Sequence, residues 1–514
     1  MCRIRHLFKR TIPLNCHRVS KNGAFRTIPF FLLFSILAHC QSPAPANSQL
    51  NYTVKVSPEN VRYVEISAEL YVTEPYLEMA RFGIPSHIPN GWAHFVQIKS
   101  IKDVNGSEIS YHWNSLRKKW RLNTLAHSKI QLNYVVKLEH DTYEWNSVGG
   151  VDGRPTVVAE STAFWVSKAL FIYPSGVQEK EVIIAFDITN GWNVSTPWQQ
   201  LEDQEFKTKN VETLVNNALM IGRHEERLIY HDEMSITLAV VPDLKHSVNL
   251  LEKTLGKILP VYRDIFGELP KANYLICASK HFFEDGEAFY NSFHQMFVDK
   301  DLEERTIVWG NVLAHEMFHY WNGTRFLIGD NVNTNSWFSE GFTEYYSNLA
   351  LVRSGLVEKE EYLSKLAYQF SRFYSSQALG DNHPNLLDAG NEKGKNWHLI
   401  YGGGASIAFI LDIEIRTLSQ GKKSLDDYMS ALYIKYGKTG VKLGLPQQID
   451  ELNALTNTDF TPFFDKYVIG NEFYLIPILQ ACAKAGLTVA QYQGEFYLKP
   501  KSGDIVFNRL IESR

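Results

Sequence analysis

Apolar residues in the first half of the chain alternate with polar ones, and this period of two constrains the fold more than any other feature of the sequence. It runs from about Asn51 to Val241 and is clearest in the segments 64–72, 130–138 and 182–188. Such alternation is typical of half-buried β-strands. Turn sequences such as 149–153 separate the segments. This half is therefore predicted to form an antiparallel β domain, which we expect to support the rest without chemistry of its own.

The second half of the chain has helical periodicity. Near Ser247 the apolar residues change to helical spacing, Pro260 is expected to kink the first helix, and Gly267 is placed to end it. Helices are expected from there to the C-terminus. Four short strands are expected to interrupt them, at 273–278, 289–298, 494–498 and 504–507. The sequence thus predicts a multidomain α+β protein.

Length and charge narrow the class of protein further. A chain of 514 residues is long enough for about three domains of ordinary size. With 45% hydrophobic and 21% charged residues, it has enough apolar surface to fold throughout. The net charge is −4, and no basic stripe follows Arg26, so a nucleic-acid partner is not expected.

Residues 1–46 have the features of a leader. A basic segment ending at Arg26 precedes the apolar run 28–37, which is the pattern of a secretory signal peptide and is too short to span a bilayer. Leu37–Cys40 resembles a bacterial lipobox that would lipidate Cys40, although His39 stands where a small residue is usual. Cleavage after Ala46 would instead release a soluble protein. Both routes predict export, to the periplasm or as an outer-membrane lipoprotein in a bacterium, and otherwise by secretion.

Two cysteines lie outside this leader. Cys277 and Cys482 allow a single disulfide at most, without the spacing of a disulfide framework. Cys277 falls in an apolar strand segment, where cysteine behaves as a small hydrophobic residue. Buried free thiols are the simpler expectation.

The segment Ala314–His319 contains the motif H-E-x-x-H. On a helix, His315 and His319 project from the same face and can reach one metal ion, while Glu316 is turned toward a water molecule on that ion. A catalytic zinc site usually takes three protein ligands, so a third is required. Glu340 and Glu344 share a face of the next predicted helix; one can bind the metal while the other accepts the free N–H of a ligand histidine.

These segments resemble one family of peptidases. H-E-M-F-H-Y-W-N from His315 and W-F-S-E-G-F-T-E-Y-Y from Trp337 are similar to the glycyl aminopeptidase family of gluzincin zinc peptidases, relatives of aminopeptidase N with a thermolysin-like catalytic domain. The resemblance implies one Zn²⁺ ion, with Glu340 as its third ligand and Glu344 behind a ligand histidine. The spacing from His319 to Glu340 is slightly longer than in aminopeptidase N relatives.

The same resemblance assigns two further residues. Tyr401, which opens the run Tyr401–Ala405, matches the tyrosine that donates a hydrogen bond to the developing oxyanion. The three glycines after it lack the Lys-Ser/Thr ending of a phosphate loop. Glu287 is a candidate for binding the free amine of the substrate, although this glutamate lies one position away from the place of the corresponding glutamate in the family pattern. The PDZ domain common in the family is expected to be missing, because too few residues follow Gly486.

The domain boundaries follow from these patterns. We expect a leader at 1–46, the β domain at 48–245, the thermolysin-like catalytic domain at 246–375 and a mainly helical domain at 376–514. The function implied is hydrolysis of peptide bonds through a metal-activated water, with an aminopeptidase for small N-terminal residues favoured. An endopeptidase with the same chemistry and a non-catalytic exported peptide-binding protein are the alternatives.

Overall fold

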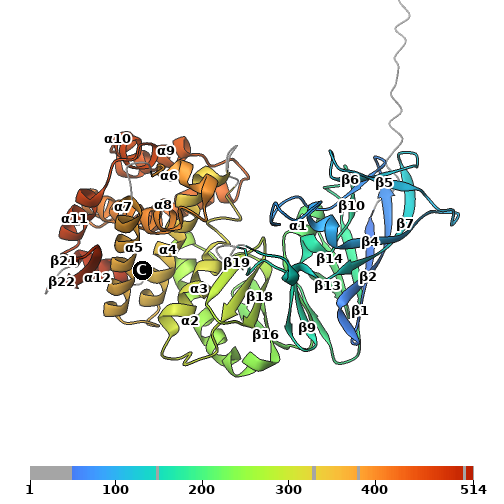
Figure 1. The fold of residues 1–514 in the computed structure, drawn as a ribbon. Coiled ribbons are helices and arrows are strands. Elements are labelled where there is room, and N and C mark those ends of the chain that lie inside the picture. Colours follow the sequence, from blue (N-terminus) through green and yellow to red (C-terminus); the bar gives the residue numbers. More distant parts are fainter. Residues whose placement is uncertain (1–48, 146–149, 327–331, 379–382, 502–504, 513–514) are drawn as a thin grey trace, which may run out of the picture. The chain divides into compact units, whose positions relative to one another are not determined.

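The computed structural model describes residues 49–145, 150–326, 332–378, 383–501 and 505–512. Along these residues strands come first, then a mixed sheet with helices, and then mainly helices, as Figure 1 shows from blue through green and yellow to red. The predicted fold class is confirmed. The lipidation and cleavage predicted at Cys40 and Ala46 lie outside the described residues.

Three sheets build the N-terminal region. The largest has the order β13 (Gln199–Glu202), β14 (Glu205–Thr208), β11 (Val182–Asp187), β1 (Leu50–Ser57), β2 (Asn60–Val72), β7 (Ser128–Lys137) and β4 (Val96–Asp103). The second has the order β10 (Tyr173–Pro174), β3 (Tyr76–Glu78), β6 (Lys119–Leu122) and β5 (Tyr111–Asn114). The third has the order β12 (Asn193–Ser195), β15 (Ala218–Gly222), β9 (Thr162–Val166) and β8 (Thr156–Ala159).

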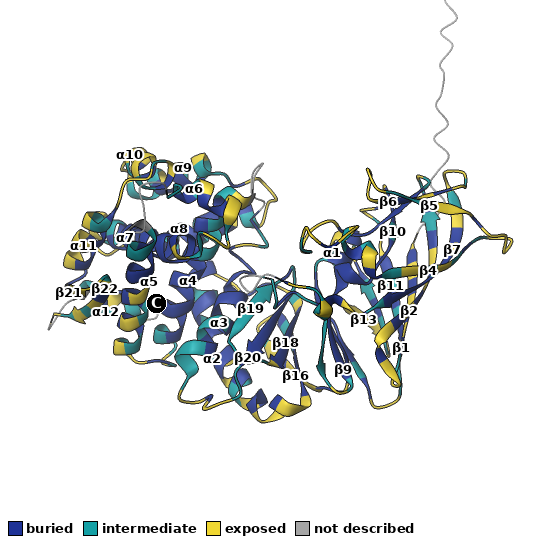
Figure 2. Cartoon of the chain, in the orientation of Figure 1, coloured by how far each residue is buried: buried dark blue, intermediate teal, exposed yellow. Residues whose placement is uncertain are grey.

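Strand β2 shows why these residues form a sheet. Val64, Ile66 and Leu70 are buried, while neighbours such as Glu65 and Glu69 are exposed, so one face packs into the core. Figure 2 shows this alternation as dark blue and yellow along the strands. One pairing departs from the antiparallel prediction: β1 runs parallel to β11, with Leu50 opposite Val182. Alternation reports which face of a strand is buried, and it does not report the direction of the neighbouring strand.

A five-stranded mixed sheet lies under the helices that follow. Its order is β16 (Glu225–His231), β17 (Met234–Val240), β18 (Ala272–Lys280), β20 (Ser292–Phe297) and β19 (Asp285–Ala288). The pairs β17–β18 and β18–β20 are parallel, and the edge strand β19 is antiparallel to β20. The domain boundary expected at 245 remains a prediction, but the pairing of β17 with β18 crosses it. The strand predicted over 289–298 begins only at Ser292. Residues 289–291 form the turn that connects it to the separate strand β19.

Helices α2 to α4 pack against each other beside this sheet. Helix α2 (Val248–Phe266) contains Pro260 and ends at Gly267, whose φ of 82° is the left-handed conformation that glycine adopts readily. It is followed by α3 (Thr306–Phe318) and α4 (Ser336–Arg353). The hydroxyl of Tyr262 in α2 donates a 2.7 Å hydrogen bond to the carbonyl of Ala314 in α3, which fixes α3 against α2. Helix α4 is buried along most of its length (Figure 2).

The C-terminal region is mainly helical. Its elements are α5 (Lys359–Ala378), α6 (Leu386–Ala389), α7 (Gly404–Leu418), α8 (Leu425–Leu432), α9 (Leu445–Thr456), α10 (Thr461–Phe464), α11 (Leu475–Lys484), the hairpin β21 (Leu487–Tyr492) and β22 (Glu495–Pro500), and α12 (Ile505–Ile511). The strand predicted at 504–507 is wrong over its described residues, because residues 505–507 belong to α12. Phe507 and Leu510 are buried at helical spacing, which the short apolar run did not reveal.

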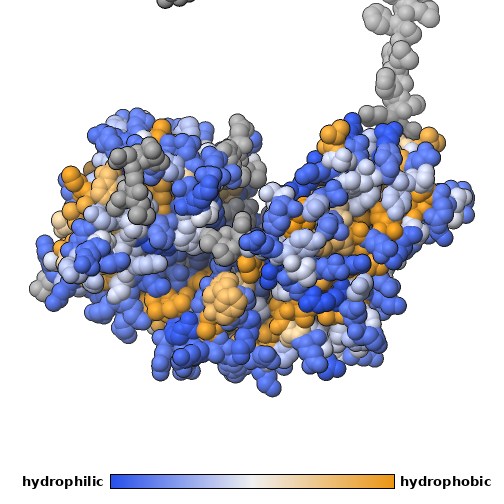
Figure 3. All heavy atoms as spheres, viewed as in Figure 1, coloured by the Kyte–Doolittle hydropathy of each residue, from blue (hydrophilic) through white to orange (hydrophobic). Residues whose placement is uncertain are grey.

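Two further expectations concern cysteines and membranes. Cys277 and Cys482 are buried and free, so the simpler expectation holds; burial raises the pKa of both thiols. Among the described residues, no helix is both long enough and apolar enough to cross a bilayer. The face drawn in Figure 3 is mainly hydrophilic, with apolar residues between the polar ones, as is normal for a folded chain.

Candidate metal centre

Helix α3 carries both histidines of the motif toward α4. His315 lies in its last turn and His319 caps its end, with the His319 amide donating to the carbonyl of His315 at 3.2 Å. The two imidazole rings lie 4.7 Å apart. The helix ends at Phe318, but His319 retains helical backbone angles, so both rings still share one face.

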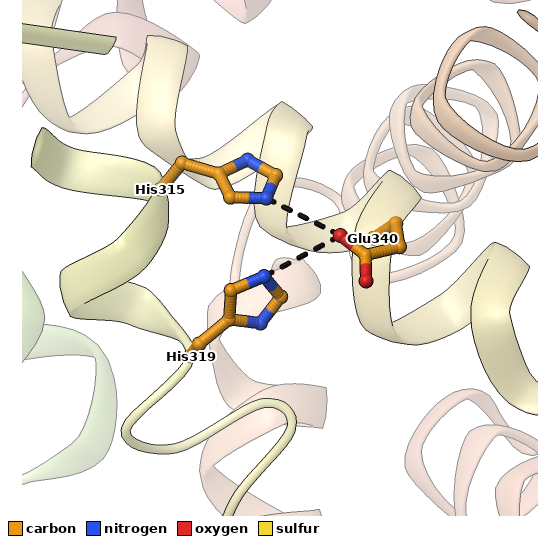
Figure 4. A group of neighbouring side chains, drawn as sticks. All are labelled: His315, His319 and Glu340. Carbon is orange, nitrogen blue, oxygen red and sulfur yellow. Dashed lines mark hydrogen bonds and ion pairs between the residues drawn. The ribbon is translucent and has the colours of Figure 1, made fainter. Parts of the chain in front are cut away.

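Helix α4 supplies a carboxylate oxygen between the two rings. Oε2 of Glu340 lies 3.3 Å from Nε2 of His315 and 3.4 Å from Nε2 of His319 (Figure 4). The three atoms form the metal-ligand cluster found among the described residues, all within 4.8 Å of one another. Atoms about 2.1 Å from a tetrahedral ion lie about 3.4 Å apart. The two distances from Glu340 therefore suit a tetrahedral metal ion held between these donors.

Groups behind the histidines fix their orientation. Nδ1 of His315 lies 3.3 Å from Oε2 of Glu344, and Nδ1 of His319 lies 2.9 Å from the carbonyl of Asn322. Each contact places a proton on Nδ1 and leaves Nε2 free to bind a metal. The amide of Gln369 donates a 2.7 Å hydrogen bond to the other oxygen of Glu344. The predicted position of Glu344, one turn after Glu340 and behind a ligand histidine, matches this geometry.

The electrostatics of this cluster favour a positive charge. Burial lowers the pKa of His315, but hydrogen bonds with Glu340 and Glu344 outweigh burial and raise it to about 10. Burial raises the pKa of Glu344, but the hydrogen bond with His315 lowers it to about 2. The carboxylates are thus arranged to stabilise a cation between them.

Glu316 lies beside the cluster and is not one of its three donors. It is buried but lines the cleft, and its carboxylate makes no hydrogen bond with another described residue. Burial raises its pKa, His315 and His319 lower it, and the net shift is upward. A carboxylate with a raised pKa and free oxygens suits general base catalysis.

Tyr401 lies in the π-helical segment η7 (Leu399–Gly403) and faces the cluster. Its ring stacks on Trp397 at 3.8 Å between centroids and lies 5.9 Å from the ring of His315. Burial, and then the charge of Glu340, raise its pKa well above the ordinary value, so the phenol stays protonated and can donate a hydrogen bond. Widened helical turns of this kind are frequent at functional sites.

The glycines after Tyr401 allow two helices to approach closely. A Cβ atom on Gly404 would lie 2.1 Å from the carbonyl oxygen of Trp337, and one on Gly341 would lie 2.3 Å from the Cα of Gly404. Glycine is therefore needed where α7 crosses α4. A Cβ atom on Gly402 would lie 2.7 Å from the carbonyl oxygen of Gln369 on α5, so close packing explains glycine at both 402 and 404.

We expect Gly404→Ala to lower the free energy of unfolding by about 1–3 kcal/mol, because the added methyl group must push α7 away from α4. The matched control is Gly256→Ala in the exposed middle of α2, where an added Cβ meets nothing within 4 Å. That change should raise stability by about 0.5–1 kcal/mol. Thermal unfolding of both variants checks the prediction, and an unchanged Gly404→Ala midpoint would contradict it.

All seven residues singled out in the sequence line one cleft of about 850 Å³. They are His315, Glu316, His319, Glu340, Glu344, Tyr401 and Glu287. Glu287 lies on β19, and a Cβ on Gly153 would lie 2.4 Å from its carboxylate, so a larger residue at 153 would displace this carboxylate. The structure brings these residues together, while their roles remain predictions.

The cleft also contains residues that the sequence did not indicate. Asp152 is fully buried beside Glu287, and its Oδ2 has no hydrogen-bond partner in the described part of the chain. Burial, and then the charge of Glu287, raise its pKa well above the ordinary value. Asp285 lies on β19 near both, and Nζ of Lys393 lies 2.8 Å from Oε1 of Glu340. Asp152 falls in a glycine-rich segment that predicts only a turn, and Lys393 has no motif around it.

Solved structures share this fold. An aminopeptidase N family protein from Idiomarina loihiensis aligns with a TM-score of 0.71 at 18% identity, covering 86% of this chain and 79% of the other. An M1 zinc metallopeptidase mutant from Deinococcus radiodurans, bound to the substrate Tyr-Ser-Ala, aligns with a TM-score of 0.56 at 12% identity, covering 84% and 95%. The chain therefore has an aminopeptidase N-like fold, which contains the cluster of three donors.

Family models carry the assignment further. The model of the M61 glycyl aminopeptidase matches residues 309–402, and the model of the peptidase M61 N-terminal domain matches residues 47–223. Together they cover more than half of the chain, and the first spans every residue from His315 to Tyr401. A search of curated proteins found no match. The chain belongs to the M61 glycyl aminopeptidase family and is a peptidase, which confirms the resemblance.

Proposed function

We propose that this protein is a zinc-dependent aminopeptidase that removes small residues from the N-terminus of peptides, with one Zn²⁺ held by His315, His319 and Glu340. The observation that carries the proposal is the single Glu340 oxygen placed 3.3 and 3.4 Å from the two Nε2 atoms. The family's description as a glycyl aminopeptidase supports the preference for small residues.

Each residue around the metal has a separate task in this proposal. Zn²⁺, when bound, supplies a Lewis acid for the scissile carbonyl and for water. Glu316 accepts a proton from the attacking water and delivers it to the leaving amine. Tyr401 donates a hydrogen bond to the oxygen of the scissile carbonyl as negative charge develops there. Glu344 holds His315 in the tautomer that leaves Nε2 free.

Carboxylates at the edge strand support exopeptidase activity. Glu287 and Asp285 on β19 give one wall of the cleft negative charge, and the buried Asp152, whose pKa is raised well above its ordinary value, lies beside Glu287. A protonated α-amino group placed there would be stabilised by this charge and would fix the first residue of a peptide beside the metal. Glu287 is the residue that we assign to amine binding.

Substrates with free and blocked N-termini test the proposal. Alanyl and glycyl 4-nitroanilides should be hydrolysed, while their N-acetyl derivatives should be cleaved at least about 100-fold more slowly, because the amine would lose its carboxylate partners. Phenylalanyl and leucyl substrates should be slower than glycyl and alanyl ones. Cleavage of internal bonds in blocked peptides at comparable rates would identify an endopeptidase instead.

Metal content is measured on the same preparation. One zinc per chain and loss of activity on chelation, restored by Zn²⁺, are expected. Protein that binds peptides without zinc and without turnover would be the non-catalytic alternative.

We also retain export through the leader as a proposal, with or without a lipid on Cys40. Intact-mass measurement of the protein isolated from its host distinguishes a lipidated Cys40 from cleavage after Ala46.

A further inference from the structure

We propose that the α5 wall of the cleft, formed by Arg372 and Lys365, binds a carboxylate of the substrate on the leaving-group side of the scissile bond. This inference rests on the proposed function and narrows its substrate class. It favours short peptides whose own C-terminus reaches this wall, or peptides with an acidic side chain just after the bond that is cut.

Arg372 is a buried cation that forms no direct ion pair with a described carboxylate, although its charge and that of Lys365 act on Glu344 from farther away. Its relative exposure is 7%, and the one hydrogen bond that its side chain makes to a described residue runs from Nη1 to Oε1 of Gln369 at 3.0 Å. Its Nε has no partner, and no carboxylate of the described chain forms an ion pair with it. Buried charges are normally paired, because an unpaired ion loses its hydration without compensation. The guanidinium group therefore has capacity left for an anionic ligand.

The position of Arg372 fits a ligand that also reaches the metal cluster. Its guanidinium carbon lies 5.4 Å from the ring centroid of Tyr401, and that ring lies 5.9 Å from the ring of His315. The distance from the guanidinium carbon to the centre of the His315 ring therefore cannot exceed the sum of these two distances. Since an extended peptide rises about 3.3 Å per residue, a carboxylate bound there belongs one or two residues beyond the scissile bond.

Neighbouring groups strengthen this wall. Lys365 lies on the same helix as Arg372, α5, and lines the same cleft. Its ammonium group forms no direct ion pair with a described carboxylate. The rings of Trp397 and Tyr401 lie beside the guanidinium group, at 5.6 and 5.4 Å. Arginine presents a planar fork that suits a carboxylate, and the rings restrict its motion.

Apart from Lys393, which pairs with Glu340, the acidic and basic groups of these two walls lie on different elements. Asp285 and Glu287 lie on β19, which packs on α3, whereas Arg372 and Lys365 lie on α5, which packs on α4. The metal donors lie on α3 and α4, between these walls. A zwitterionic di- or tripeptide has its ammonium and carboxylate groups at the two ends that this arrangement would hold.

One competing role must be separated from substrate binding. Through Gln369, Arg372 also connects to Glu344 and so to His315. If it only held this chain of hydrogen bonds in place, its loss would weaken the metal site for every substrate equally. Carboxylate binding would affect only substrates that carry the carboxylate.

Four substrates with the same first residue make this distinction. They are the tripeptide Ala-Gly-Gly, its C-terminal amide, the amide of Ala-Asp-Gly and alanine 4-nitroanilide. We expect kcat/KM for the free acid or for the aspartyl amide to exceed that of the neutral amide about tenfold or more. A preference for the free acid identifies the peptide C-terminus as the ligand, and a preference for the aspartyl amide identifies the side chain.

Variants assign the preference to the wall. Arg372→Met and Lys365→Met should raise KM about tenfold for the favoured acid and change hydrolysis of the neutral amide and nitroanilide little, while Arg372→Lys should retain part of the preference. Glu344→Gln is the control for the positioning role: it weakens the hold on His315, does not alter either partner of the Gln369–Arg372 hydrogen bond, and should slow all four substrates without changing their ratios. Equal hydrolysis of acid and amide by the unaltered enzyme, or a uniform loss in Arg372→Met, would overturn the inference.

A binding measurement separates this inference from the proposed function. Calorimetric titration of the zinc-loaded Glu316→Gln variant with Ala-Gly-Gly and its amide should give tighter binding of the acid, whether or not the enzyme turns these peptides over. If none of the four substrates were hydrolysed, the proposed function would be contradicted. Equal affinities for acid and amide would contradict only the inference that the wall binds a carboxylate.

Discussion

Replacing Glu316 by glutamine is expected to lower kcat by about 10³-fold or more while leaving zinc bound. The amide has nearly the same shape as the carboxylate but cannot accept the proton of the attacking water. Glu316 is outside the set of three donor atoms, so the metal should remain at one per chain. Parallel measurement of kcat and zinc content checks both parts.

The matched control is Glu304→Gln, an exposed residue just before α3. It loses the same charge close to the same helix and should retain ordinary activity. A Glu316→Gln variant that retained substantial turnover would show that another group accepts the proton. Loss of zinc from this variant would show instead that Glu316 contributes to holding the metal.

Tyr401→Phe is expected to lower kcat by about 10²–10³-fold with little change in KM. The phenyl ring can keep its 3.8 Å stack on Trp397, so the change removes the hydroxyl and little else. A hydrogen bond to the carbonyl oxygen is worth most when negative charge has developed, which is why turnover should fall more than ground-state binding.

Steady-state kinetics on alanine 4-nitroanilide measures this split between kcat and KM. Tyr374→Phe, on α5 and packed against Phe473 and Phe496, is the control for loss of a phenolic hydroxyl elsewhere. A Tyr401→Phe variant with unchanged kcat would remove Tyr401 from the mechanism, and a change in KM alone would assign it to substrate binding.

Much of the donor cluster was predictable because it depends on helix geometry. His315 and His319 are four residues apart on one helix, and Glu340 and Glu344 are four apart on the next. Spacing alone left open which acid meets the metal. The structure distinguishes them, since Glu340 approaches Nε2 of both histidines and Glu344 approaches Nδ1 of one.

The walls of the cleft were not predictable in the same way. Asp152 belongs to the N-terminal region but lines the cleft. Its backbone carbonyl accepts a 2.7 Å hydrogen bond from Nδ1 of His294 on β20. Arg372 occupies a helix whose pattern does not distinguish a buried arginine from a solvated one. Such contacts depend on how distant segments pack against each other, and this packing cannot be predicted from a pattern of apolar residues.

The fold shows the same division between local and distant information. Alternation located β2, β7 and β11, and helical spacing located α2 and α4, because burial of one face sets the period. The partners of the strands were not determined by period. Thus the pairing of β17 with β18 and the parallel pairing of β1 with β11 emerged only from the structure.

The parallel pairing of β1 with β11 has a consequence for the order of folding. Strand β1 can pair early with β2, which follows it directly, but Leu50 lies opposite Val182, so β1 cannot gain β11 as its second neighbour until all of the intervening chain has been synthesised. Contacts between residues so distant in sequence form slowly, because a long loop must close before the pairing stabilises it. The first strand of the described chain is therefore among the last to find both of its neighbours, and the backbone edge that pairs with β11 remains without its partner strand in the meantime.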